Sequence, residues 1–230
     1  MSDTAALPTP PTTDRAHPGR PHRAGGRSVG RAVAVLTGPA LLLTSELLAP
    51  RFPAGLDTAG EGAFLLAHQG RFTAASLLGS LAGVLLAVSV VLVAARTPGR
   101  GRRPLWVAAG CAVLGGAGLT MHHATTLGGL DALAGGATPE SLVPMAEGPG
   151  AAASILGLVV GTTLVAVLLA VAARRSRRTG WWPLAVAVLG VAANLSGFAW
   201  GTVAFVIAIG VLLAVHLRPA PCAGGVADHP

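Results

Sequence analysis

Long apolar stretches separated by short polar segments dominate the chain. Four of them are long enough for a helix of about 20 residues to cross a bilayer, and they cover residues 32–50, 72–95, 105–127 and 151–173. A fifth apolar region runs from 181 to 217. This pattern predicts an all-α, polytopic membrane helix bundle.

The fifth apolar region is too long for one span. As a single helix it would be roughly 55 Å long, whereas the hydrocarbon core of a bilayer is about 30 Å thick. The turn-forming sequence Asn194-Leu195-Ser196-Gly197 lies near its middle. We therefore predict two spans here, at 181–196 and 198–217, and six transmembrane helices in all.

The arginines predict the orientation of these spans. Fourteen of the 16 basic residues, all of them Arg, precede the first span or follow the second, fourth or sixth. The exceptions are Arg51 and Arg71, and the acidic residues Asp57, Glu61, Asp131, Glu140 and Glu147 fall in the alternate loops. By the positive-inside rule both termini are cytoplasmic and the chain lies in the cell membrane. A five-span arrangement, which would export Arg218, violates the rule only mildly.

The segments outside the spans are predicted to be tails and loops. Residues 1–30 and 219–230 lack apolar periodicity and are predicted to be disordered tails on either side of a transmembrane domain at 31–218. A secretory signal is the alternative for the N-terminus, but the long polar lead-in and an acidic residue in the apolar run favour an uncleaved first span.

Two outer loops follow from the same arrangement, at 51–71 and 128–150. In the first, Phe64, Leu65 and His68 have helical spacing, which predicts a short interfacial helix leading into the second span. The second is rich in Gly, Pro and acidic residues and is predicted to be the longer outer loop.

Composition agrees with a membrane location. The chain is 52% hydrophobic with a mean hydropathy of +0.66, and 11% of its residues are charged, against about 25% in soluble domains. The net charge of +7 comes from arginines beside apolar spans, so anionic lipid headgroups are the expected partner and nucleic acid is not. Cys111 lies in a span and Cys222 in the tail, so no disulfide is predicted.

Small residues predict how the spans pack. Three Gly-xxx-Gly pairs allow helix backbones to approach closely, namely Gly79 with Gly83, Gly157 with Gly161, and Gly197 with Gly201. Packing within the chain is the first expectation, and a homo-oligomer is the alternative. Pro39 within the first span predicts a kink.

Glu46 is the first candidate for a functional residue. A carboxylate inside a bilayer costs about 2.5–3.5 kcal/mol on insertion scales, so it is expected to face protein or water and to mark a functional site. It lies in the outer half of the first span. We expect it to bind a ligand or, in an enzyme, to act as the catalytic acid.

Three histidines are predicted to lie at a similar depth on the outer side: His68, His122 and His123. Glu46, His68 and His122 form the predicted ligand-binding set, and the imidazoles of all three histidines also suit Zn, Cu or non-haem Fe. Two histidines on different helices could instead hold a haem axially. Adjacent His122 and His123 point about 100° apart, so they would not normally share one ion. The alternative is that they are hydrogen-bonding anchors at the interface.

A resemblance rests on short motifs: Leu47-Leu48-Ala49-Pro50, the Ala67–Phe72 sequence AHQGRF, the Arg-rich 96–103 loop and a His in the third span. With these the chain resembles a broad group of small actinobacterial multi-pass membrane proteins of unknown function. A bias toward Ala, Gly, Pro and Arg agrees with a GC-rich genome. The resemblance implies about six spans and supplies no activity.

Three functions remain open from the sequence. The favoured one is a non-enzymatic protein that binds a small ligand or ion at an outer-side pocket and senses or moves it. The second is an intramembrane enzyme acting on a lipid or isoprenoid, with Glu46 as acid and His122 as its partner. The third is a structural or assembly partner. No P-loop lysine, HExxH or CxxC occurs in the chain.

Overall fold

The computed structural model describes residues 24–196 and 200–218, and in these ranges the chain is helical with no strand. The predicted C-terminal tail lies outside the described residues, as does most of the predicted N-terminal tail. The first helix begins at Ala24, so it includes the last residues of the predicted 1–30 tail.

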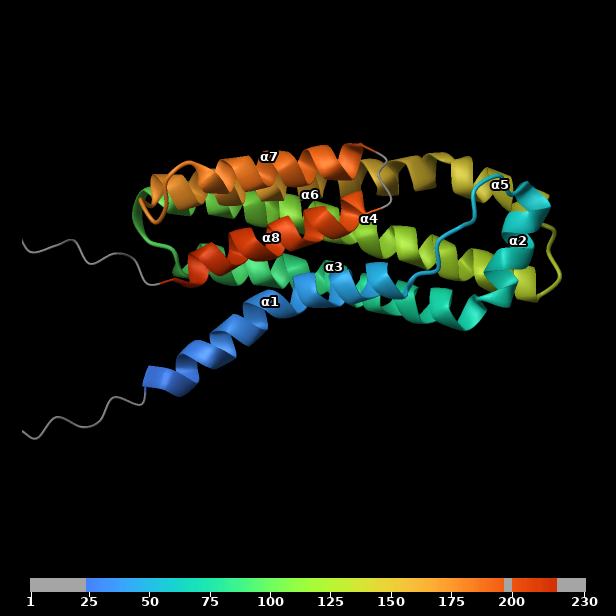
Figure 1. Ribbon diagram of the computed structural model, residues 1–230, viewed down its shortest axis with the longest axis horizontal. Helices are drawn as coiled ribbons and strands as arrows, with labels where there is room; N and C mark the ends of the chain where they lie inside the picture. Colours follow the sequence, from blue (N-terminus) through green and yellow to red (C-terminus); the bar gives the residue numbers. More distant parts are fainter. Residues whose placement is uncertain (1–23, 197–199, 219–230) are drawn as a thin grey trace, which may run out of the picture.

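The chain forms a bundle of long helices with two short ones across one end (Figure 1). The helices are α1 (Ala24–Leu48), α2 (Thr58–Ala67), α3 (Gln69–Arg96), the 3₁₀ turn η1 (Gly99–Gly101), α4 (Arg102–Ala134), α5 (Pro139–Glu147), α6 (Pro149–Arg175), α7 (Trp182–Leu195) and α8 (Gly201–Leu217). Helices α2 and α5 lie at the end opposite the start of α1 and the end of α8 (Figure 1).

Four helices in the described residues are long and apolar enough to cross a membrane: α1, α3, α4 and α6. Helices α7 and α8 are apolar but shorter, with 14 and 17 residues. The region from 181 to 217 therefore forms two helices rather than one, divided close to the predicted turn. The all-helical fold and the membrane character of the chain agree with the prediction.

The segment predicted as the longer outer loop, 128–150, is mostly helical. Helix α4 continues to Ala134, and α5 forms most of the remainder. The reason is that Leu130 and Leu133, three residues apart, extend a buried helix face and are only 2% and 6% exposed. The 33 residues of α4 give a length of about 50 Å, so α4 projects beyond a hydrocarbon core of about 30 Å.

Glycines bring α4 into backbone contact with α3. A Cβ atom added to Gly83 or Gly116 would lie within 2.7 Å of a carbonyl oxygen of the other helix. No side chain fits between these backbones, so only glycine allows this approach.

Helix α6 approaches the other face of α4 in the same way. A Cβ on Gly118 would lie 2.5 Å from the backbone nitrogen of Leu158, and one on Gly161 would lie 2.5 Å from that of Gly115. The predicted pairs Gly79–Gly83 and Gly157–Gly161 thus face other parts of this chain, whereas Gly197 lies outside the described residues.

Helix α1 bends near its middle (Figure 1) and contains Pro39, as the sequence predicted. Beside the proline, a Cβ on Gly38 would lie 2.6 Å from the backbone nitrogen of Leu86, so α1 packs closely on α3 at the bend. In its C-terminal half the Ser45 hydroxyl donates a hydrogen bond of 2.8 Å to the carbonyl of Ala75. The C-terminal half of α1 is therefore fixed to α3.

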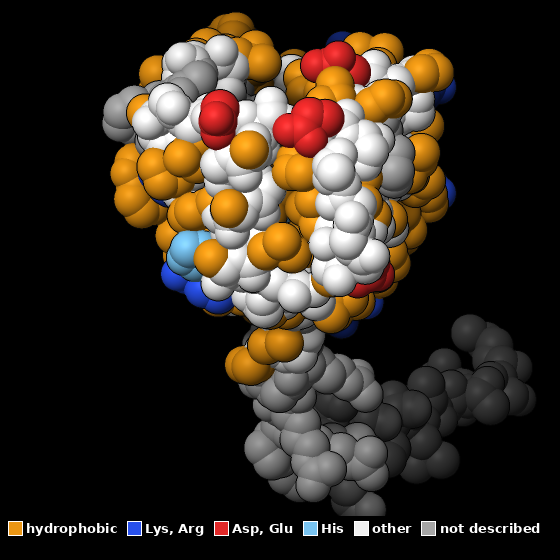
Figure 2. Space-filling view, turned by 90° about the vertical axis from the view of Figure 1, so that its right-hand side faces the viewer, with side chains coloured by type: hydrophobic (Ala, Val, Ile, Leu, Met, Phe, Trp, Pro, Cys, Tyr) orange, Lys and Arg blue, Asp and Glu red, His pale blue; other side chains and the backbone are white. Residues whose placement is uncertain are grey.

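Charge is divided between the two ends of the bundle. Acidic side chains lie on the end formed by α2 and α5 (Figure 2), where Asp57, Glu61, Asp131, Glu140 and Glu147 belong. The two arginines near this end have structural contacts. Arg71 donates a 3.0 Å hydrogen bond to the carbonyl of Leu48 at the end of α1, and the Arg51 guanidinium lies 3.7 Å from the ring centroid of Trp200. These contacts explain why both depart from the charge pattern.

Substitution at the α4–α6 contact tests this packing. We expect Gly118→Leu to lower the free energy of unfolding by at least about 1–3 kcal/mol, because the added side chain meets the α6 backbone. Gly110→Leu is the matched control, since no atom lies within 4 Å of its added Cβ. Denaturant unfolding in detergent micelles measures both, and equal losses would refute the close-packing account.

Candidate functional site

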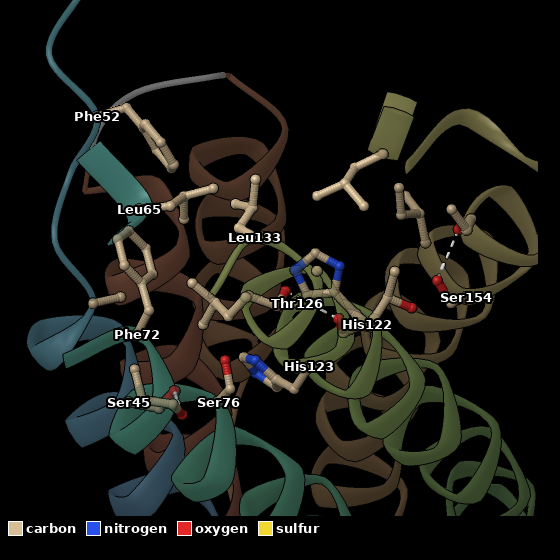
Figure 3. A pocket seen from close by; sticks show the side chains of 18 of the residues that line it. Ser45, Phe52, Leu65, Phe72, Ser76, His122, His123, Thr126, Leu133 and Ser154 are labelled. Atoms are coloured by element: carbon tan, nitrogen blue, oxygen red, sulfur yellow. Dashed lines mark hydrogen bonds between the residues drawn. The ribbon is translucent and has the colours of Figure 1, made fainter. Parts of the chain in front are cut away.

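A cavity of about 500 Å³ opens among α1, α3, α4, α5 and α6 near the acidic end of the bundle. Figure 3 shows side chains from these elements and from the α1–α2 segment converging on it. Its larger apolar lining residues are Phe52, Leu65, Phe72, Leu130, Leu133, Leu142 and Ile155, and its polar ones are Ser45, Glu46, Ser76, His122, His123, Thr125, Thr126 and Ser154. The site is thus mostly apolar with a limited set of polar groups, as small-molecule sites usually are.

The cavity brings together three of the four residues predicted to meet on the outer side. Glu46 comes from α1, and His122 and His123 come from α4. Helix α3 packs against both of these helices, and its glycines keep the separations small. Residues more than 70 positions apart in the chain therefore line one cavity.

Glu46 is half-buried at the cavity wall. Within residues 24–196 and 200–218 its carboxylate has no hydrogen bond or salt bridge, although Arg51 is close enough to attract it electrostatically. Arg51 itself is stacked on Trp200. The carboxylate oxygens are consequently left as acceptors for a group that enters the cavity.

His123 occupies a space that a glycine provides. A Cβ on Gly79 would collide with the His123 imidazole, so this ring can lie against α3 only where residue 79 has no side chain. Its Nε2 atom is buried and has no hydrogen-bond partner. A buried imidazole nitrogen without a partner is costly, and this one lies against the backbone of α3 at Gly79 rather than in the open cavity.

His122 lies beside His123 but is more exposed. The two ring centroids are 5.5 Å apart and the ring planes are inclined by 60°. Figure 3 shows both rings at the cavity, with His123 toward Ser76. The two adjacent histidines thus contribute to one site despite their different directions on the helix.

His68 is placed differently from the prediction, because it is not among the residues that line the cavity. It lies at the junction of α2 and α3, where its Nδ1 is 3.0 Å from the carbonyl oxygen of Phe64 and its ring centroid is 4.3 Å from the Phe64 ring. Phe64 packs in turn against Phe52 and Phe72, which do line the cavity. His68 therefore supports the aromatic wall from outside.

The structure does not assemble the predicted metal or haem ligands. Within the part of the chain that the structure describes, no group of three or more His, Cys, Asp or Glu residues is placed to hold a metal ion. The two histidines at the cavity belong to one helix, whereas axial haem ligation was predicted to use two helices, and His68 lies outside the cavity. The candidates His68, His122 and His123 thus form no common coordination sphere.

Hydroxyl groups at the cavity were missed in the sequence. Several donate their proton to a carbonyl: Ser45 to Ala75, Thr125 to Met121, Thr126 to His122 and Ser154 to Ala151, at 2.7–3.1 Å. Each keeps lone pairs free to accept a further hydrogen bond. The spacing of Thr125 and Thr126 three and four residues after His122 was a signal that could have identified them.

The polar part of the cavity is therefore rich in acceptors. The carboxylate of Glu46 and the lone pairs of these hydroxyls accept hydrogen bonds, and a neutral imidazole accepts at one nitrogen. A cavity of this kind is complementary to an apolar molecule whose polar end donates hydrogen bonds.

Comparison with known proteins gives no family or relative for this chain. No protein-family model matches the sequence, and neither a curated protein nor a solved structure is significantly similar to it. The resemblance to small actinobacterial membrane proteins accordingly stays a prediction. The cavity is therefore the basis for assigning a function.

A double-mutant cycle tests the pairing of Gly79 with His123. We expect Gly79→Ala to destabilise the protein by roughly 1–3 kcal/mol, because the new methyl group displaces the imidazole. In a His123→Ala background the same change is expected to cost much less. Unfolding in detergent measures the four variants, with Gly110→Ala as control. A cost that is equal in both backgrounds would show that the ring does not occupy this space.

Proposed function

We propose that this chain is a six-span membrane protein that binds a small amphipathic molecule in its outer-side cavity and senses or moves it. The ligand has an apolar body and a head group that donates hydrogen bonds, such as an amine or a hydroxyl. The observation that carries the proposal is the convergence of Glu46, His122 and His123 in one mostly apolar, acceptor-rich cavity.

The contact of Arg51 with Trp200 supports six spans. Arg51 follows the end of α1, and Trp200 directly precedes α8, so the start of α8 lies beside the end of α1 and α8 runs toward the arginine-rich end. Helices α7 and α8 would be about 21 and 26 Å long, and local thinning of the bilayer accommodates spans of this length. The arginine-rich end is then cytoplasmic and holds both termini.

The absence of partners for Glu46 favours ligand binding over a purely structural role. A polar residue that holds membrane helices together does so by hydrogen bonding across them. In the described residues the Glu46 carboxylate forms no such bond, whereas the nearby Ser45 hydroxyl does. Ser45 therefore performs the structural task, and Glu46 is left to a ligand.

One observation also favours an enzyme as the second candidate. Glu46 and His122 line the same cavity, so an acid and a second proton-transfer group would be present beside an apolar lipid or isoprenoid substrate. Conversion of such a substrate by the purified protein, lost in Glu46→Gln, would replace binding with catalysis as the primary function.

Ligand retention is the direct test. We expect small molecules that co-purify with the protein in lipid nanodiscs, detected by mass spectrometry, to be lost from Glu46→Gln and His122→Ala. Equilibrium dialysis with octylamine and 1-octanol would distinguish an amine from a hydroxyl head group, and we expect at least about tenfold weaker binding of the preferred probe in both variants.

Glu140→Gln is the matched control for Glu46→Gln, because it removes the same group at the same end of the bundle but outside the cavity. Wild-type binding in the cavity variants, with all three proteins folded, would overturn the proposal.

Cysteine accessibility tests the six spans. In a chain with Cys111→Ala and Cys222→Ala, we expect Ser196→Cys to react with a membrane-impermeant maleimide in intact cells. We expect Arg100→Cys, at the opposite end, to react only after permeabilisation. Protection of Ser196→Cys in intact cells together with reaction after permeabilisation would contradict an outer connection between α7 and α8.

A further inference from the structure

A second pocket lies at the arginine-rich end of the bundle, far from the outer cavity. Its volume is about 210 Å³, and it is formed where α1, α3, the α6–α7 connection and the end of α8 meet. Its polar lining residues are Arg31, Arg96, Thr97, Arg178, His216 and Arg218. Four guanidinium groups from four separate parts of the chain thus surround one small space.

No carboxylate in the described residues balances this charge. The acidic residues in these ranges are Glu46 and the five at the α2–α5 end, and none lines the pocket. The carboxyl ends of α3 and α8 contribute about half a negative elementary charge each. The positive charge of four arginines clearly exceeds this negative charge, so the pocket keeps a strong positive potential.

The structural role of Arg178 uses only part of its guanidinium. Its Nη1 donates hydrogen bonds of 2.6 and 2.9 Å to the carbonyls of His216 and Arg218, which caps α8. Its Nε, however, is buried without a hydrogen-bond partner. A helix cap alone does not require three further arginines around Arg178. Within the described residues, the side chains of Arg31 and Arg96 form no hydrogen bond.

His216 supplies an independent sign of a missing partner. It lines the pocket and is 7% exposed, with its Nε2 3.0 Å from the carbonyl oxygen of Leu169. Its Nδ1 is buried and unpartnered. Buried polar atoms are normally satisfied, so these two nitrogens point to a ligand. The Arg178 Nε–H is a donor for an anionic oxygen, and the His216 Nδ1 accepts from a ligand hydroxyl in the neutral ring or donates in the protonated one.

We propose that this pocket binds a phosphate group at the cytoplasmic end of the bundle. Guanidinium groups bind phosphate through paired, charge-assisted hydrogen bonds, and basic pockets between membrane helices on the cytoplasmic side suit anionic lipid headgroups. The volume fits a phosphate with a small substituent. Its source is either the headgroup of an anionic phospholipid or free phosphate.

The test uses the full chain purified in detergent and compares three probes: dioctanoyl phosphatidylglycerol, dioctanoyl phosphatidylcholine and inorganic phosphate. We expect phosphatidylglycerol to raise the thermal unfolding midpoint more than phosphatidylcholine does. The double variant R31Q/R96Q is expected to bind it at least about tenfold more weakly. Its matched control is R100Q/R103Q, which removes equal charge from the same end but outside the pocket.

The outcomes separate the two sources. Stabilisation by phosphatidylglycerol alone assigns the pocket to a lipid headgroup, and stabilisation by inorganic phosphate, lost in R31Q/R96Q, assigns it to the free anion. Equal weakening in both double variants would show only diffuse attraction and overturn the proposal, as would no effect of any anionic probe. If R31Q/R96Q fails to fold, the single variants R31Q and R96Q answer the same question.

Discussion

The close approach of helix backbones at glycine is the interaction on which the rest of this structure depends. Helix α4 contacts α3 at Gly83 and Gly116, and it contacts α6 at Gly118 and Gly161. In lipid there is no hydrophobic force between helices, so dispersion contacts at such short range are what hold them together. The outer cavity forms among these helices, and one more glycine, at position 79, admits the imidazole of His123 to its wall.

The two ends of the bundle belong to this one scaffold but carry opposite charges. Their chemistry therefore differs. At the acidic end a single carboxylate lies in a mostly apolar cavity, where four of the lining hydroxyls donate their protons to backbone carbonyls. At the other end arginines crowd a small pocket without an acid to neutralise them. The first suits an apolar molecule with a donor head group, and the second suits a phosphate. In both the cavity and the basic pocket, helix packing brings together residues that lie far apart in the sequence.

Apolar periodicity predicted the long helices well, because a bilayer span demands a length and hydrophobicity that few other structures need. It could not predict that α4 would continue past Gly128 and Gly129, since the burial of Leu130 and Leu133 depends on neighbouring helices. For the same reason Glu46 and His122 were recognised as candidates, but their meeting across α3 was not derivable. The basic pocket could not be predicted from the sequence. Its arginines indicate only the membrane topology until the fold shows that the ends of their helices lie together.

The hydrogen bond from Arg71 to the carbonyl of Leu48 joins the two ends of the segment between α1 and α3. It ties the end of α1 to the start of α3, so the intervening segment with Phe52 and α2 is a loop closed at its base. This loop supplies Phe52 and Leu65 to the cavity, and Gly55, with φ of +82°, gives it a turn that other residues rarely adopt. Because Phe52 and Phe64 pack against Phe72 of α3, the closed loop and the α1–α3 clamp hold this wall of the cavity in place together.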